Sequence, residues 1–284
     1  RTLSKNGISY VEAGSIDQPI CDRRGDLICA DWGYAYLAST NGSGKSVSLG
    51  DYYGMKESFV KNGTLATTKT KWTTRKEEDN PAMAYVHNLG SVSNSGKEGF
   101  MMLGYDDIYS IEYMYEKRMG YWKHDGKVTI FDAFEKLRDN YQAIMERCRA
   151  FDELIYDDAE KAGGKKYAEI CSASYRQVIS AHKLFTDKEG NLLWFSKENN
   201  SNGCVNTVDL TYPSAPLFLV YNPELQKAMM TSIFEYSASG RWNKPFPAHD
   251  LGTYPIANGQ VYGGDMPIEE GGNMVILAAA ISKI

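Results

Sequence analysis

The sequence predicts a multi-domain protein of mixed α and β structure, with a β-rich first part and a mostly helical second part. Short runs of β-branched and aromatic residues, separated by Gly, Asn and Ser turns, dominate residues 1–120. Apolar residues spaced three and four apart recur in residues 121–284. A chain of 284 residues has room for one large or two ordinary domains. We therefore expect a β domain over residues 1–120 and a helical domain over residues 121–284.

Within the first part, the expected strands are short and end at turn residues. They are GISYVEAG (7–14), SVSLGDYY (46–53), TLATTKTKW (64–72), AMAYVHNLG (82–90) and EGFMMLGY (98–105). The alternation of Trp32, Tyr34 and Tyr36 is typical of a half-buried strand. The segment from Asn41 to Lys45 lacks the first glycine of a phosphate loop and no helical pattern follows it, so it predicts a hairpin turn.

Two acids, Asp106 and Asp107, stand where the first part gives way to the second. They either cap a helix in an interdomain connection or reach the pocket from the β domain. After them, apolar spacing predicts a helix from Thr129 to Cys148 and a second helix after the break at Gly163-Gly164.

The rest of the second part has one expected strand and two expected helices. LLWF (192–195) predicts a short strand, and His182 just before it is expected to be a core or capping histidine. Asn222-Pro223 predicts the start of a helix that ends at Gly240. A last helix is expected from about Gly272. It is still apolar at Ile284, so we expect the native chain to continue.

Bulk composition excludes several classes of protein. The net charge is −5, and the lysines and arginines are scattered, so nucleic acid is not an expected partner. The longest apolar run, MVILAAAI (274–281), is too short to span a bilayer. The five cysteines show no CxxC spacing, which predicts neither a zinc site nor a disulfide framework, and Cys148 is expected to be a buried thiol.

The stretch from Ser196 to Asn273 is dense in acids, amides, aromatic residues, glycines and prolines, and it predicts ordered loops that line one pocket. Hydrolysis of an amide or a glycosidic bond needs one group to protonate the leaving atom and another to activate water. We expect Asp209, Glu270 and Asp250 to be the catalytic groups. Burial among apolar residues is expected to raise the pKa of Asp209, although a structural role for this residue is equally open.

Further residues of the stretch are candidates for binding the substrate. Arg241 with Trp242 suggests a corner for a carboxylate or, equally, a surface salt bridge. One of Glu269 and Glu270 is expected to complement a helix dipole while the other faces the cleft. His249 next to Asp250 suggests an oriented imidazole, but adjacent residues seldom face each other, so we expect a weak pairing. The full set of expected binding residues is Glu198, Arg241, Trp242, His249, Tyr254, Asn258 and Glu269.

Five motifs resemble the glutaminase A family, secreted proteins of fungi and gut Bacteroidetes. They are SKENNSNGCVNTVDLTYPSAPLFLVYNPEL, RWNKPFPAHDLGTYPIANGQVYGG, MPIEEGGNM, LGYDDIYSIEYM and CADWGYAYLAS. The resemblance covers nearly the whole chain. It implies a β-sandwich-like N-terminal part followed by part of an (α/α)6 toroid of the six-hairpin glycosidase type. The readable helices are too few to close such a ring, so the remainder of the polypeptide is expected to complete it.

The resemblance also implies conversion of L-glutamine to L-glutamate and ammonia in a secreted, periplasmic or cell-surface protein. A glycoside hydrolase of six-hairpin type, acting on a glycan, and a non-catalytic binding module stay open as alternatives. No cofactor or metal is expected. Acid-rich loops could hold Ca²⁺, but no regular loop motif supports such a site.

Overall fold

The structure is a computed structural model that describes residues 1–22, 25, 30–66, 80–198 and 202–284. It divides into two compact units. Unit 1 comprises residues 1–18, 31–107 and 128–141, and unit 2 comprises residues 19–30, 108–127 and 142–284.

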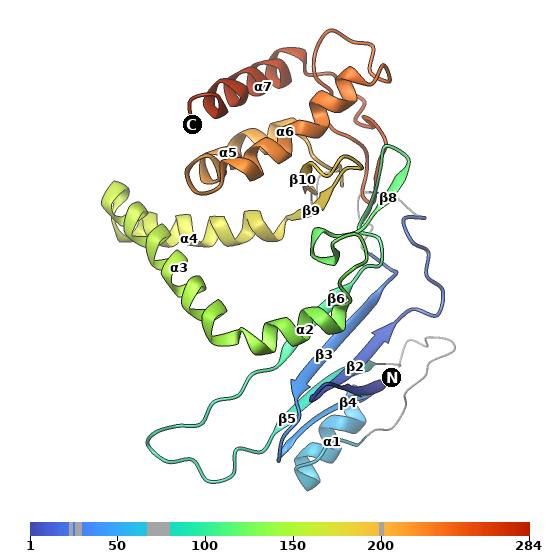
Figure 1. Cartoon of the computed structure of the whole chain (residues 1–284), viewed down its shortest axis with the longest axis vertical. Helices are drawn as coiled ribbons and strands as arrows, with labels where there is room; N and C mark the ends of the chain where they lie inside the picture. Colours follow the sequence, from blue (N-terminus) through green and yellow to red (C-terminus); the bar gives the residue numbers. More distant parts are fainter. Residues whose placement is uncertain (23–24, 26–29, 67–79, 199–201) are drawn as a thin grey trace. The chain divides into compact units, whose positions relative to one another are not determined.

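Unit 1 is built on an antiparallel sheet with the strand order β1-β2-β3-β6. A second antiparallel pair, β4-β5, and two helices complete the unit (Figure 1). The elements are β1 (Thr2–Lys5), β2 (Ile8–Gly14), β3 (Tyr34–Thr40), β4 (Lys45–Asp51), α1 (Tyr52–Asn62), β5 (Pro81–His87), β6 (Met102–Asp106) and α2 (Ile130–Asp139).

The period-two alternation of the strands gives the four-stranded sheet two buried faces. Val11 and Leu37 pack with Val47 and Leu49 of β4 on one face. On the other face the ring of Tyr10 lies 5.5 Å from that of Phe134 and 5.1 Å from that of Phe131, both on α2. Residues next to each other in a strand point to opposite faces, which explains why Tyr10 and Val11 serve different cores.

Three predictions for unit 1 meet different outcomes, and one helix was not predicted. Most of the expected strand at residues 64–72 lies outside the described residues. The helix α1 was not predicted, although Asp51 caps it by accepting a hydrogen bond from Gly54 N at 2.8 Å. The segment Asn41–Lys45 is a turn, but not a hairpin turn, because β3 and β4 belong to different sheets. Asp106 and Asp107 do not cap a helix, since the next element along the chain is a strand.

Unit 2 is mostly helical, with short strands at one side. Its strands are β7 (Ile111–Tyr113), β8 (Glu116–Arg118), β9 (His182–Thr186), β10 (Leu192–Ser196) and β11 (Ile256–Ala257). Its helices are the 3-10 turn η1 (Tyr121–Lys123), α3 (Tyr141–Gly163), α4 (Lys165–Ser180), α5 (Val208–Tyr221), α6 (Pro223–Ala238) and α7 (Pro267–Ile281).

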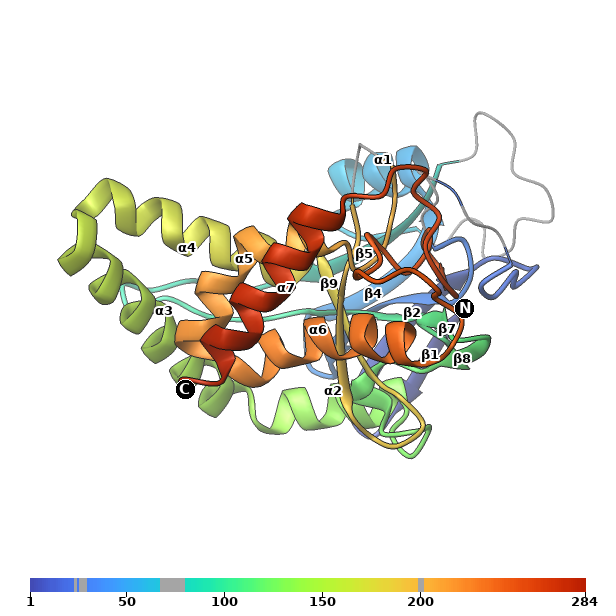
Figure 2. The same ribbon diagram turned by 90° about the horizontal axis from the view of Figure 1, so that it is seen from above.

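Helices α4, α5 and α6 pack with the β9-β10 hairpin in one apolar cluster. Trp194 of β10, Phe218 of α5 and Met229 of α6 are all buried in it. Helix α5 contacts both α6 and α7, and Figures 1 and 2 both show α7 running alongside α5. This packing brings the first turns of α5 and α7 to one region of the unit.

Several predictions from local sequence signals in unit 2 are confirmed. The helix break at Gly163-Gly164, the strand that contains LLWF and the start of α6 at Asn222-Pro223 are confirmed. His182 is confirmed as a core histidine, although it lies on β9. Its ring stacks on Trp194 with centroids 4.9 Å apart.

Three predictions for unit 2 were wrong. The TVDLTYPSAPLF segment forms helix α5 rather than a loop, because its apolar residues are buried against neighbouring elements in spite of Pro213 and Pro216. Helix α7 begins at Pro267, not near Gly272. Cys148 is exposed rather than buried. As a separate observation, no disulfide joins the described cysteines, Cys21, Cys148, Cys171 and Cys204.

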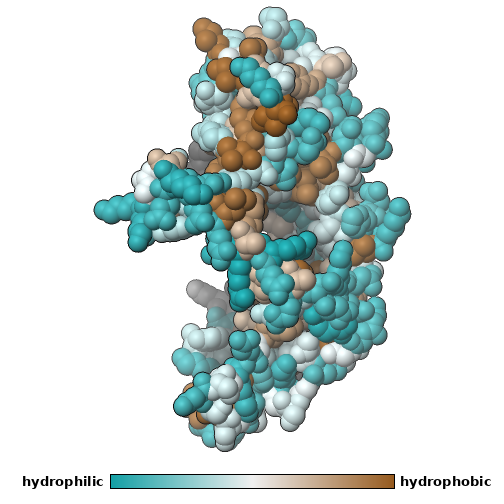
Figure 3. All heavy atoms as spheres, turned by 60° about the vertical axis from the view of Figure 1, so that its left-hand side comes forward, coloured by the Kyte–Doolittle hydropathy of each residue, from teal (hydrophilic) through white to brown (hydrophobic). Residues whose placement is uncertain are grey.

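Hydrophobic side chains are also found on the surface. Figure 3 shows them gathered over the part of the molecule that the helices of unit 2 occupy. Val220, Ile268 and Val275, on α5 and α7, are among the exposed ones. Within the described residues, no helix combines the length and the apolar character needed to cross a membrane.

Candidate functional site

Backbone hydrogen bonds between three segments of unit 2 build the candidate site. Asn206 N donates to Ser196 O, and Glu198 N donates to Cys204 O, each at 2.9 Å. Val208 N donates to His249 O, also at 2.9 Å. The strand end that carries Glu198, the first turn of α5 and the loop around His249 are thereby held side by side.

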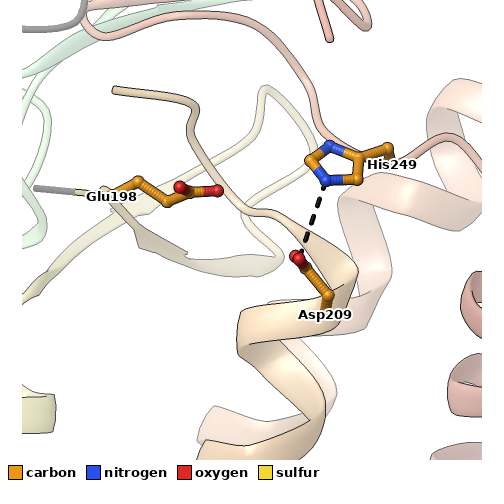
Figure 4. A group of neighbouring side chains, drawn as sticks. All are labelled: Glu198, Asp209 and His249. Atoms are coloured by element: carbon orange, nitrogen blue, oxygen red, sulfur yellow. Dashed lines mark ion pairs between the residues drawn. The ribbon is translucent and has the colours of Figure 1, made fainter. Parts of the chain in front are cut away.

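Three side chains from these segments converge (Figure 4). Glu198, Asp209 and His249 each offer one ligand atom, and these atoms all lie within 4.8 Å of one another. His249 Nε2 lies 3.7 Å from Asp209 Oδ2. Because Asp209 stands in the first turn of α5, the helix N-terminus also favours its negative charge.

The imidazole of His249 lies between two carboxylates. Its Nδ1 atom is 3.0 Å from Asp250 Oδ2, so the expectation of a weak pairing between these adjacent residues was wrong. The ring of Tyr262 stacks on it with centroids 4.3 Å apart. Burial disfavours the imidazolium, but Asp209 and Asp250 outweigh that effect and raise the pKa of His249 to about 10.

The buried carboxylate of Asp250 also holds the loop that carries the histidine. Its Oδ1 accepts hydrogen bonds from Gly252 N at 2.9 Å and Val261 N at 3.0 Å, and its Oδ2 accepts one from Tyr262 N at 3.2 Å. His249 N donates to the side-chain oxygen of Gln260 at 2.9 Å. The chain therefore folds back on itself around Asp250, which fixes the imidazole.

Glu270 adds a further carboxylate from the first turn of α7. Its side chain is fully buried, and neither of its oxygens has a hydrogen-bond partner among the described residues. Burial first, and then the negative charge of Asp209, raises the pKa of Glu270 to about 8. Of the two candidates at this turn, Glu270 faces inward and Glu269 is exposed, in agreement with the expected division between them.

The carboxylates of the cluster differ in their protonation. The interaction of Asp209 with His249 lowers the pKa of Asp209, although burial alone would raise it. The predicted upward shift was therefore wrong. Burial and the charge of Asp209 raise the pKa of Glu198. Asp209 is therefore ionised at neutral pH, whereas Glu270 retains its proton. Two carboxyl groups whose pKa values are separated in this way can act as base and acid.

Arg241 and Trp242 have partners outside this cluster. The guanidinium of Arg241 lies 5.0 Å from the centre of the Tyr115 ring, and its Nη1 is 2.9 Å from Met114 Sδ. The indole nitrogen of Trp242 donates to Phe246 O at 2.5 Å. Among the described residues Arg241 forms no ion pair, so the surface salt bridge is not found there.

Tyr254 and Asn258 also contact other residues. Lys183 Nζ and Lys197 Nζ lie 5.7 and 5.8 Å from the centre of the Tyr254 ring. The Asn258 amide donates to Glu112 Oε1 at 2.6 Å, and its oxygen accepts from Tyr115 N at 2.7 Å. These contacts give Asn258 a structural role that joins the β11 region to β7 and β8.

Two residues of the site were not predicted from the sequence. Tyr262 supports the face of the His249 ring, and Gln260 fixes the histidine backbone. The signal available for both was their place in a Gly-rich and aromatic loop. That signal does not distinguish them from their neighbours.

The chain is similar to proteins of one known family. A family model described as the glutaminase A six helical-hairpin domain matches residues 164–284, and a domain of unknown function (DUF5127) matches residues 1–158. Glutaminase A of Aspergillus oryzae is 34% identical over 262 residues, which are 89% of this chain and 38% of that protein. A protein of Arthroderma benhamiae named as a probable glutaminase is 36% identical over 127 residues, which are 44% of this chain and 15% of that protein.

The chain thus spans 38% or less of the length of these two curated relatives. The match to glutaminase A nevertheless extends over 89% of this chain. The six-hairpin match covers the segment that carries Glu198, Asp209, His249 and Glu270. On these grounds, the chain belongs to the glutaminase A family.

Proposed function

We propose that this chain carries the active site of a glutaminase-like amidohydrolase that converts L-glutamine to L-glutamate and ammonia. One observation carries the proposal: a single cluster contains an ionised carboxylate, a buried protonated carboxyl group and a histidine fixed between two acids. Amide hydrolysis needs these groups, because water has to lose a proton as it attacks and the leaving nitrogen has to gain one.

Each role follows from the state of the group. Asp209, whose pKa is lowered, accepts a proton from the water that attacks the side-chain carboxamide carbon. Glu270, whose pKa is raised to about 8, gives its proton to the departing nitrogen. His249 and Asp250 hold Asp209 in its ionised form, and Glu198 lines the same cluster.

The names of the relatives support the choice of glutamine over a glycan, since both curated relatives are named as glutaminases. The family resemblance further supports a location outside the cytoplasm. It also supports a pocket completed by other parts of the polypeptide, because the chain spans 38% of glutaminase A of Aspergillus oryzae.

The test is an assay of ammonia release from L-glutamine by the intact protein, with a panel of glycosides as alternative substrates. Glu270→Gln and Asp209→Asn should each lose at least about a hundredfold in kcat, the usual size of a general acid or base contribution. Glu269→Gln is the matched control, since this acid stands in the same turn but is exposed. Glycoside cleavage without ammonia release would favour the glycoside hydrolase. Ligand binding without turnover of either substrate would favour the binding module.

A further inference from the structure

His249 and Asp209 lie at the distance of an ion pair rather than that of a hydrogen bond. At 3.7 Å, Nε2 and Oδ2 are too far apart for a normal hydrogen bond. Two ligand atoms bound at 2.0–2.2 Å to one tetrahedral zinc ion lie about 3.4 Å from each other. The spacing of this pair is therefore close to the one that a shared cation imposes, and the ligand atom of Glu198 lies within 4.8 Å of both.

The other ring nitrogen of His249 is arranged as in metal-binding histidines. Such histidines nearly always give their second N–H to a carboxylate or a carbonyl, which fixes the tautomer and the orientation of the ring. Asp250 Oδ2 lies 3.0 Å from Nδ1 and is itself fully buried. With the proton on Nδ1, the lone pair of Nε2 is directed toward Asp209.

The carboxyl groups around the imidazole give an independent reason for a cation. Glu198, Asp209 and Asp250 surround His249, and the fully buried Glu270 has no hydrogen-bond partner for either oxygen among the described residues. A protonated imidazole compensates one negative charge at most. Buried carboxylates are otherwise retained by pairing or by coordination of a metal.

We propose that Glu198, Asp209 and His249 bind a divalent transition-metal ion, for which zinc is the first candidate. One imidazole nitrogen and two carboxylate oxygens suit such an ion better than Ca²⁺ or Mg²⁺, which prefer oxygen ligands alone. Three protein ligands leave a fourth position for water, as in catalytic rather than structural zinc sites. This ion replaces the expectation from sequence that the protein has no metal.

The role of the ion rests on the proposed function. Asp209 Oδ2 faces His249, whereas Oδ1 is buried without a hydrogen-bond partner among the described residues. With Oδ2 on the ion, Oδ1 would remain to accept a proton from the attacking water, and the ion would make that water more acidic. The oxygen would add to the carboxamide carbon, and the proton of Glu270 would leave with the nitrogen as ammonia. The ion itself undergoes no redox change.

Calorimetric titration of the intact, chelator-stripped protein with ZnCl₂ tests the proposal without glutamine. We expect one saturable site per chain in this region. His249→Ala and Asp209→Asn should weaken zinc binding by well over tenfold, and Asp250→Asn by about 10- to 100-fold. Glu270→Gln should bind zinc as the wild type does, because Glu270 is not a ligand. Glu198→Gln, a milder change, is the ligand variant to use if the others fail to fold by circular dichroism.

Each result has a defined meaning. Zinc binding that is absent, or that is equal in the wild type and the ligand variants, overturns the proposal and means an adventitious ion only. Full ammonia release by the chelator-stripped protein also overturns it and leaves protonated His249 as the cation of the cluster. Specific zinc binding without any ammonia release would instead refute the proposed function and leave the metal site standing.

Discussion

The carboxylate of Asp250 turns back on its neighbour, so that Oδ2 lies 3.0 Å from Nδ1 of His249. This geometry is possible because the same carboxylate also gathers the backbone N–H groups of Gly252, Val261 and Tyr262. Asp250 is thus a positioning residue: it fixes the imidazole and closes the loop on which the imidazole stands.

Asp250→Asn should therefore lower both activity and stability. The amide keeps one oxygen acceptor but directs an NH₂ group at backbone donors, and an unmatched buried donor costs about 1–3 kcal/mol. We expect a lower melting temperature together with a kcat reduced by more than tenfold. Asp265→Asn is the control on the same connection, because Asp265 is exposed and pairs with Lys244 at the surface. Equal effects of the two substitutions would contradict the special role of Asp250.

Glu270→Gln should stabilise the metal-free protein as the pH rises. The carboxyl group has a pKa of about 8 in the folded state, against an ordinary value of 4.5. Between these values the unfolded state releases the proton and the folded state retains it, so the free energy of unfolding of the wild type falls as the pH increases. Glutamine does not ionise and removes this loss.

The measurement is urea denaturation of both proteins at pH 5 and pH 8 in the presence of a chelator. The free energy of unfolding of the variant, relative to that of the wild type, should be higher at pH 8 than at pH 5. The variant should also lose ammonia release. If the difference in free energy of unfolding between the two proteins is the same at both pH values, Glu270 has an ordinary pKa and cannot be the acid.

His182 should make the protein less stable in mild acid. Burial lowers its pKa to about 4 from 6.5, although the bond between Nδ1 and Val178 O works in the other direction. Between pH 6.5 and pH 4 the unfolded state binds the proton that the folded state excludes, so stability is lost as the pH falls through this window. At pH 5 the loss is about 2 kcal/mol relative to pH 7.

His182→Phe keeps a ring to stack on Trp194 and has no proton to bind. Chemical denaturation at pH 5 and pH 7 should show a smaller decrease for this variant than for the wild type. A decrease of the same size in both proteins would assign the acid sensitivity to other groups.

The parts of the fold that could be predicted from sequence are those with local causes. Asn222 caps α6 by accepting from Leu225 N at 3.3 Å, and Pro223 fits the first helical position, so the sequence marks this start by itself. Helix α5 could not be predicted in this way, because Pro213 and Pro216 are local signals against a helix. Its burial against α6 and α7 decides the outcome.

In the candidate site, too, only features with local causes could be predicted from the sequence. The acids Asp209 and Glu270 could be selected because their residue types suit hydrolysis and their motifs are unusual. The pairing of Asp209 with His249 could not be predicted, since it depends on the bond from Val208 N to His249 O across forty residues of chain. The predicted direction of the pKa shift of Asp209 was wrong because this pairing with His249 was not foreseen.

Gly252→Ala should disrupt the loop that carries His249. Gly252 has φ of +140°, and an added Cβ would lie 2.1 Å from the backbone oxygen of Ile256. Both the backbone conformation and the contact exclude a side chain, so the loop would have to shift. We expect a loss of about 2 kcal/mol or more in the free energy of unfolding, together with weaker activity. Gly263→Ala, on the same connection, is the matched control because its Cβ would meet nothing within 4 Å. Urea denaturation and ammonia release measure the two effects, and near-normal values for Gly252→Ala would show that His249 does not depend on this close backbone approach.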